Sequence, residues 1–361
     1  MDTGDDVREN VKKYYGSLLE STVDVKTSAP SCSLSCGMVK SVTDALSLIH
    51  PEVTKKFFGC GLPFAAKLEG CRVLDLGSGS GRDSYAYSKL VGPTGHVTGI
   101  DMTEELINTS RQYIEYHQKK FGYKEPNITF SQGYMEKLSE AGIQNDSMDV
   151  VLSNCVICLC ADKRAVLQQA YNVLKEGGEL YFSDMYASKV VPDHMTKDVV
   201  LWGEGLGGSM YWQDFITLAQ SVGFSTPHLV SASRIVIYNC ELKEKAGDIS
   251  YASVTYRLFK LPKNAVLSAA TVTYKGTVAD FPDQLVFDSS HSFKKDVAAE
   301  VDGEMAAILQ SSRFITDFQI QMSDRPAESS SASTQQYCHL NPFLLADKLG
   351  SSVKQCSKTG K

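Results

Sequence analysis

The chain has 361 residues, of which 43% are hydrophobic and 22% charged, and its net charge is −6. This composition is typical of a globular protein with one sizeable core and room for a smaller second unit. The acidic balance and the lack of a long Lys/Arg run argue against nucleic acid or an anionic membrane as a partner. The opening MDTGDDVREN lacks the pattern of a signal peptide, and no apolar stretch approaches the roughly 18 residues of a membrane helix, so we expect a cytoplasmic protein.

Strands and helices are expected to alternate along the first half of the chain. Cys71–Val91 reads as a strand, a glycine turn and a helix; Gly95–Asp101 is a second strand, and Glu104–Gly122 a second helix. NITFSQGYM, SMDVVLSNCVI and GGELYFSDMY supply three more strands, with a helix over Arg164–Lys175 between the last two. This order predicts an α/β fold with a mostly parallel, doubly wound sheet and helices on both faces.

The pattern changes after about Val190. The segment SYASVTYRLFKL (Ser250–Leu261) is expected to add a further strand. Residues 261–325 look like a small mixed appendage. We expect residues 326–361, which include the polar run ESSSAST, to form a flexible tail.

A glycine motif follows the first strand directly. It has the form D-x-G-x-G-x-G and consists of Asp75, Gly77, Gly79 and Gly81. Glycines there let the backbone approach a ligand at the carboxyl edge of the sheet. Asp101 ends the second strand, where a carboxylate can accept hydrogen bonds from both ribose hydroxyls of an adenosine. A nicotinamide-binding motif requires a third glycine where this chain has Arg82, which argues against NAD as the cofactor.

The segments after the third strand and the fourth helix fit the same cofactor. YMEKL would flank an adenine, with Glu136 accepting from its amino group, and LKEGGELYFSD completes a pattern that resembles S-adenosylmethionine-dependent methyltransferases. A glycine turn without a ligand is the alternative, but the motif, the strand, the helix and the acidic residue all agree with a cofactor site.

Three cysteines cluster in SNCVICLC, at the end of the fourth strand. Ten cysteines in a cytosolic chain should mostly be reduced, which favours soft-ligand or redox chemistry, although each could be only a small buried hydrophobe. The fourth strand of such folds ends beside the methyl group to be transferred. Thiols at that position therefore indicate a soft, thiophilic acceptor.

At this level of detail the chain resembles the arsenite methyltransferases over roughly residues 10–325. The matching segments are YYG, FFGCGL, LDLGSGSGRD, GHVTGIDMT, SNCVI, GGELYFSD, and LWGEGLGG followed by YW. The resemblance implies that cysteine thiolates hold trivalent arsenic, that S-adenosylmethionine methylates it, and that thioredoxin or glutathione restores the reduced thiols. It also implies a Rossmann-like class I methyltransferase fold with an arsenic-binding insertion. We expect the chain to act as a monomer.

The resemblance assigns site residues by position. Arsenic, as substrate, falls to Cys60 and Cys155, and Cys32, or its neighbour Cys36, matches a cysteine that can pair with Cys60. The positions matching cofactor contacts, with those of the glycine motif, are Phe58, Asp75, Gly77, Gly79, Gly81, Asp101, Met102, Thr103, Met135, Glu136, Asn154 and Val156. We divide the chain accordingly into an N-terminal segment (1–40), a cofactor-binding domain (41–189), an arsenic-binding region with the last strands (190–260), the appendage (261–325) and the tail (326–361).

The expected mechanism needs no general base. Trivalent arsenic bound by sulfur keeps a lone pair that can attack the methyl group in line, so the protein has only to set the distance and exclude water. The seven histidines are accordingly interpreted as surface or structural residues, and Cys71 and Cys240 as core residues.

One position departs from the family. Gly205, in LWGEGLGG, stands where the family carries a third arsenic-binding cysteine. Three interpretations remain open: a two-thiol enzyme that favours substrates already bearing a methyl group or another thiol, a site completed by Cys158 or Cys160, and a cofactor-binding relative with little activity. A methyltransferase acting on carbon or oxygen is a weaker alternative. Gly205→Cys should strengthen arsenite binding unless the position requires a positive φ.

Overall fold

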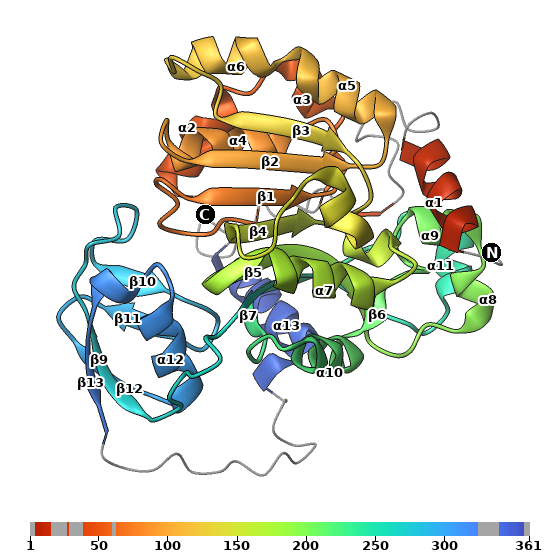
Figure 1. Ribbon diagram of the computed structural model, residues 1–361. Helices are drawn as coiled ribbons and strands as arrows, with labels where there is room; N and C mark the ends of the chain where they lie inside the picture. The colour runs from red at the N-terminus through yellow and green to blue at the C-terminus, as the bar shows by residue number, and fades with distance from the viewer. Residues whose placement is uncertain (1–3, 16–26, 29–38, 60–62, 324–338, 357–361) are drawn as a thin grey trace.

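A mostly parallel sheet forms the centre of the molecule (Figure 1). The computed structural model describes residues 4–15, 27–28, 39–59, 63–323 and 339–356, with side chains up to 350. The strand order is β3-β2-β1-β4-β5-β8-β7, and β6 pairs with β5. The strands are β1 (Arg72–Leu76), β2 (His96–Asp101), β3 (Ile128–Gln132), β4 (Met148–Asn154), β5 (Leu174–Ala187), β6 (Met210–Tyr211), β7 (His228–Arg234) and β8 (Tyr251–Phe259).

The pairing confirms the predicted doubly wound α/β fold. The five strands β3, β2, β1, β4 and β5 pair in parallel with one another in that order, whereas β8 runs antiparallel to both β5 and β7. The central strands β1 and β4 are almost continuously buried, which explains why RVLDL and MDVVLSN are apolar runs rather than alternating ones.

Helices cover both faces of the sheet. One face carries α4 (Arg82–Val91), α5 (Glu104–Gln112) and α6 (Ile114–Phe121), and the other carries α7 (Lys163–Val173) and α10 (Trp212–Val222). Successive residues of β1 divide between the two cores: Val73 packs with Tyr85 of α4, and Leu74 packs in the cluster that contains Phe215 of α10. No helix among the described residues is long and apolar enough to cross a membrane.

The helix predicted over Glu104–Gly122 is two helices. Tyr113, with φ −104° and ψ 9°, separates α5 from α6. Its ring stacks on His50 at 4.1 Å between centroids, and the His50 side chain caps α3 (Pro51–Lys55) by accepting from the backbone N–H of Glu52. The break therefore lies where an aromatic contact joins two segments that are distant in sequence.

Short helices gather at the carboxyl edge of the parallel strands (Figure 1). They are α1 (Gly4–Lys13), α8 (Asp193–Thr196), α9 (Val199–Gly203) and α11 (Cys240–Ala246), while α2 (Lys40–Ser47) packs against α4. The residues that follow α1 are attached to the end of α9, because the Tyr14 hydroxyl donates to Glu204 (2.6 Å) and the Tyr15 hydroxyl donates to the Gly203 carbonyl (2.9 Å).

A separate antiparallel unit follows the main sheet. Its three-stranded sheet has the order β12 (Ala298–Val301), β9 (Ala270–Tyr274) and β13 (Phe318–Met322), beside the hairpin of β10 (Gln284–Val286) and β11 (Ser292–Lys294) and the helix α12 (Gly303–Ser311). Phe287, Phe293 and Phe314 pack in its core.

A buried ion-pair cluster joins this unit to the main sheet. Glu179 of β5 is fully buried and contacts Arg257 of β8 (Nε, 2.6 Å) and Arg313, which follows α12 (Nη1, 2.5 Å). Burial alone would raise the pKa of Glu179, but the charges of the two arginines outweigh it and lower that pKa. The carboxylate is thus ionised and held by one arginine from each unit.

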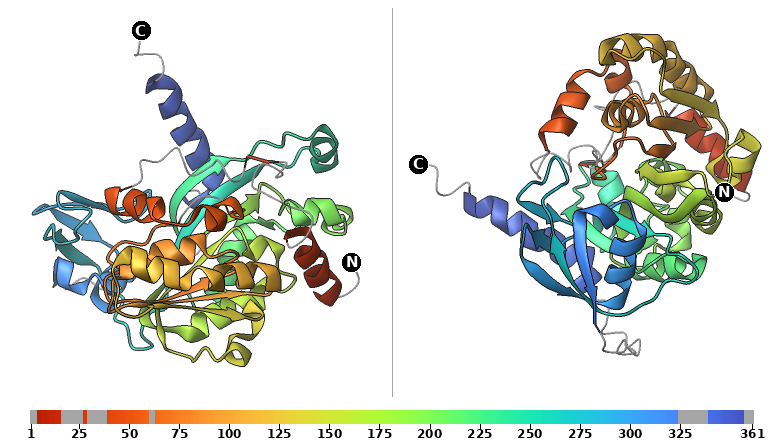
Figure 2. Two further views of the ribbon diagram at one scale, coloured as in Figure 1. Left: turned by 90° about the horizontal axis from the view of Figure 1, so that it is seen from above. Right: turned by 60° about the vertical axis from the view of Figure 1, so that its left-hand side comes forward.

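The segment predicted as a flexible tail contains a packed helix, α13 (Pro342–Cys356). Leu340, Phe343 and Ala346 are buried against the main core, and Asp347 forms an ion pair with Arg234 of β7 (2.8 Å). The prediction is therefore wrong for these residues, because apolar side chains spaced three apart give the helix a face that packs on the sheet. The rest of α13 extends away from the body of the fold (Figure 2).

Candidate active site

The glycine loop between β1 and α4 uses its glycines for three different reasons. A Cβ on Gly77 (φ +69°) would lie 2.5 Å from Val156, so only glycine allows this close packing. Gly79 (φ +54°) has open space where a side chain would otherwise stand, which leaves room for a ligand beside the loop. Gly81 (φ +92°) precedes α4 and packs under Phe130, away from the pocket described below.

Asp101 at the end of β2 faces this loop. Its Oδ2 accepts from the Gly79 N–H (2.9 Å) and its Oδ1 accepts from the Thr103 N–H (2.8 Å). Burial raises the pKa of Asp101, and these backbone hydrogen bonds offset part of the rise. Each carboxylate oxygen can accept a further hydrogen bond, so the group retains acceptor capacity for two hydroxyls.

Two more carboxyl groups lie beneath the loop. Asp83, in the first turn of α4, accepts from the Asn154 side-chain amide (2.7 Å), and Asp75 accepts from the Ser84 hydroxyl. Burial and then the nearby Asp83 raise the pKa of Asp75 to about 8. Arg82 pairs with Asp83 (2.5 Å), so the charge of Asp83 is already balanced in part.

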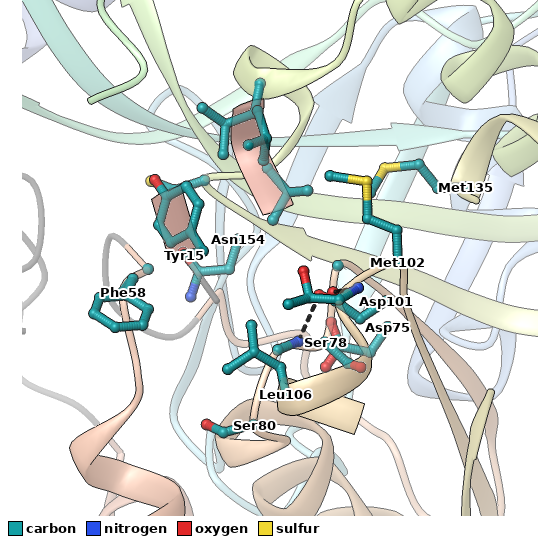
Figure 3. Close-up of a pocket in the computed structure, with 18 of the residues that line it drawn as sticks. Tyr15, Phe58, Asp75, Ser78, Ser80, Asp101, Met102, Leu106, Met135 and Asn154 are labelled. Carbon is teal, nitrogen blue, oxygen red and sulfur yellow. Dashed lines mark hydrogen bonds between the residues drawn. The ribbon is translucent and has the colours of Figure 1, made fainter. Parts of the chain in front are cut away.

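These groups line one pocket with an empty volume of about 970 Å³, including space open to solvent. Figure 3 shows Tyr15 and Phe58 on one side of it and Met102 and Met135 on the other. Of the predicted cofactor residues, the pocket brings together Phe58, Asp75, Gly77, Gly79, Asp101, Met102, Thr103, Met135, Glu136, Asn154 and Val156. Gly81 shapes the loop but does not line the pocket.

Helix α1 and the residues just after it contribute pocket residues that were not predicted from the sequence. Arg8 forms an ion pair with Glu136 (3.3 Å), and Lys12 donates to the Tyr134 hydroxyl (3.0 Å). Arg8, Val11 and Tyr15 all line the pocket. The YYG segment, which contains Tyr15, could have indicated a role, but a contact across 128 residues leaves no local pattern in the sequence.

Cys155 lies where two cavities meet. It follows β4 with φ +56°, and it lines both the large pocket and a smaller cavity of about 350 Å³. Cys158, Met185 and Gly205 line the smaller cavity. Cys155 is disulfide-bonded in this structure, while Cys32, Cys36 and Cys60 lie outside the described residues.

The other described cysteines differ in surroundings. Cys160 lines the large pocket, with its sulfur 3.5 Å from the Met135 sulfur, and Cys71 is buried outside both cavities, as predicted. Cys240 is exposed at the start of α11, so its assignment to the core is wrong. Cys240 is exposed because it is the first residue of α11, at the surface, and does not lie on the buried face of that helix.

Three of the described histidines make contacts that join distant segments of the chain. His117 is buried and stacks on Tyr85 at 3.6 Å, and His228 and His291 both contact Asp288 (2.8 Å). Among the described residues, no histidine lines either cavity.

Comparison with known proteins identifies the family. Two family models match: a methyltransferase domain over residues 67–223 and an arsenite methyltransferase C-terminal domain over residues 268–361. The arsenite methyltransferase of Mus musculus is 48% identical over 315 residues, which cover 87% of this chain and 83% of that protein. The chain belongs to the arsenite methyltransferase family. The arsenite methyltransferase of Homo sapiens is 44% identical over 97% of this chain and 94% of its own length.

A solved structure agrees. CrArsM, an arsenic(III) S-adenosylmethionine methyltransferase from Chlamydomonas reinhardtii, superposes with a TM-score of 0.77 at 40% identity, covering 82% of this chain and all of that chain. These similarities confirm the class I methyltransferase fold and S-adenosylmethionine as the cofactor of this arsenite methyltransferase family member.

Proposed function

We propose that this chain transfers the methyl group of S-adenosylmethionine to trivalent arsenic held by Cys155 and neighbouring thiols. One observation carries the proposal: Cys155 lines both the large pocket and the smaller cavity. A substrate atom bound by its sulfur would therefore sit between the two. We further propose that the chain acts as a monomer.

The residues of the large pocket fit the cofactor. Ser78 lines it and has a buried hydroxyl without a hydrogen-bond partner among the described residues, which indicates a missing polar ligand. Asp101 has acceptor capacity for the two ribose hydroxyls, and the absence of a side chain at Gly79 leaves space beside it. Asp75 and Asn154, which both line the pocket, would hold the amino acid end, and Met102 and Met135 would pack on the adenine.

When bound, S-adenosylmethionine supplies an electrophilic methyl group on a positively charged sulfur. The chain's own contribution is to hold arsenic through thiolates and to keep water away. Tyr15 and Phe58 pack edge to face at 5.5 Å and both line the two cavities. A site of this kind accelerates the reaction by fixed orientation, without a proton acceptor for the arsenic lone pair.

The oxidation state of Cys155 adds a requirement. A disulfide sulfur cannot bind arsenic, so the bond at Cys155 has to be reduced first. We infer that thioredoxin or glutathione supplies the electrons, which fits a protein that works in the reducing cytoplasm.

The test is product speciation with the reduced protein, S-adenosylmethionine and arsenite. Cys155→Ser should abolish methylated arsenic, because a hydroxyl is a hard ligand for a soft acceptor. The matched control is Cys71→Ser, which changes a buried thiol outside both cavities. Equal rates in parent and Cys155→Ser would refute the proposal, and cofactor binding without any product in the parent would indicate an inactive relative.

A further inference from the structure

We propose that Cys158 is the third arsenic-binding thiol of this chain, in place of the side chain that Gly205 lacks. This inference rests on the proposed function, since it assumes that arsenic binds at Cys155. The sequence left open whether Cys158 or Cys160 completes the arsenic site. We select Cys158, which was not among the arsenic-binding residues that the family resemblance assigned.

The geometry around Gly205 places the Cys158 sulfur in the vacated space. A Cβ built on Gly205 would lie 3.2 Å from the Cys158 sulfur and 2.1 Å from the terminal carbon of Met185. A side chain at 205 and the thiol of Cys158 would therefore compete for the same region of the cavity. With glycine at 205, that region is lined by the thiol of Cys158, in the same cavity as Cys155.

The local fold explains why Cys158 rather than Cys160 faces this cavity. The 3-10 turn η5 (Ile157–Leu159) reverses the chain after β4, and the Cys158 N–H donates to the Asp184 carboxylate (2.9 Å). Two residues later the chain has turned, so that Cys160 lines the cofactor pocket and contacts Met135. Cys160 does not line the smaller cavity.

Asp184 of β5 acts as a positioning residue for the thiol. It is buried, its Oδ1 accepts from the Met185 N–H (2.7 Å), and its carboxylate is hydrogen-bonded to the Cys158 side chain. Burial, followed by the charge of Asp184, raises the pKa of Cys158, so the free thiol is protonated at neutral pH. The sulfur is thus held in one orientation before substrate arrives.

Binding is a condensation in which atoms balance. Each As–S bond forms as one As–O bond of arsenous acid breaks, and the thiol proton leaves with the hydroxide as water. No oxidant or reductant takes part in this step once the thiols are reduced. Arsenous acid can exchange all its hydroxyls in this way, whereas monomethylated trivalent arsenic has only two to exchange, so only arsenite uses a third thiol.

The direct test is the number of sulfur ligands on bound arsenite. X-ray absorption is measured without S-adenosylmethionine, on protein reduced by a phosphine that brings no thiol. We expect three sulfurs in the parent and in Cys71→Ser, and two in Cys158→Ser and Cys158→Ala. The affinity for arsenite should fall about 100-fold in both Cys158 variants, since a tethered third ligand acts at high effective concentration, while monomethylated arsenic should bind almost as in the parent.

The outcomes separate this inference from the proposed function. Three sulfurs in the folded Cys158 variants, or a loss of sulfur in Cys160→Ser but not in Cys158→Ser, would overturn the inference and leave the methyltransferase assignment intact. A parent that binds no arsenite would overturn both. Calorimetry with S-adenosylmethionine checks that the variants are folded, and using both serine and alanine guards against a misfolded single variant.

Discussion

Introducing a cysteine at Gly205 should destabilise the protein rather than improve it. Gly205 has φ +80°, and an added Cβ would lie 2.1 Å from the terminal carbon of Met185. Met185 is only 4% exposed and packs in the cluster that also contains Cys158 and Leu206, so it has little room to move. The sequence predicted that Gly205→Cys would strengthen arsenite binding unless position 205 requires a positive φ. Because Gly205 does have a positive φ, we do not expect this gain.

The size of the loss follows from two contributions. A residue with a Cβ in the left-handed region costs about 1–2 kcal/mol relative to glycine. Crowding a well-packed core by one side chain costs about 1–3 kcal/mol. The free energy of unfolding of Gly205→Cys should therefore fall by roughly 2–5 kcal/mol.

Urea unfolding of the reduced protein measures this loss. Gly205→Ala is the matched control, since it adds the same Cβ without sulfur and should lose a similar amount. In a double-mutant cycle, Met185→Ala should recover the crowding contribution but not the backbone contribution. An unfolding free energy of Gly205→Cys within about 0.5 kcal/mol of the parent would refute the reasoning.

Three further predictions concern the cofactor pocket and pH. Asp101→Asn should weaken S-adenosylmethionine binding by about 1–3 kcal/mol in calorimetry, because it replaces a charged acceptor, and unchanged affinity would contradict the ribose assignment. Arg8→Ala removes the ion pair to Glu136 and should accelerate cofactor release in stopped-flow experiments; an unchanged release rate would mean that α1 does not retain the ligand. A hydrogen bond to Asp288 raises the pKa of His291, so this contact stabilises the fold fully below pH about 6.5 and loses its effect as pH rises through the raised pKa. His291→Asn should remove that part of the pH dependence of unfolding, and a variant with the parental pH profile would disprove the contribution.

The sequence predicted the parallel sheet and the cofactor loop because both leave local patterns. Apolar runs mark β1 and β4, and the glycines after β1 have positive φ values that other residues rarely adopt. Asp101 was predictable for the same reason, since the end of β2 fixes its place relative to the loop.

The rest of the site depends on contacts that no local pattern encodes. Arg8 reaches Glu136 only because α1 packs over the carboxyl edge of the sheet. Cys158 and Cys160 are chemically equal in the sequence, and the 3-10 turn alone places one in the smaller cavity and the other in the large pocket. The packing of Phe343 against the main core was not predicted, because the polar run ESSSAST before it indicated a flexible segment up to the end of the chain.

The cluster around Glu179 makes the two structural units of this chain inseparable in practice. A chain that ended before β9 would keep every strand of the parallel sheet and lose Arg313, which leaves Glu179 with one of its two partners. Removing one partner of a buried ion pair costs about 3–5 kcal/mol, a large share of the 5–15 kcal/mol that usually holds a protein folded. The units should melt in one transition, and exchanging the C-terminal unit between family members would succeed only where the donor carries an arginine that reaches the same carboxylate.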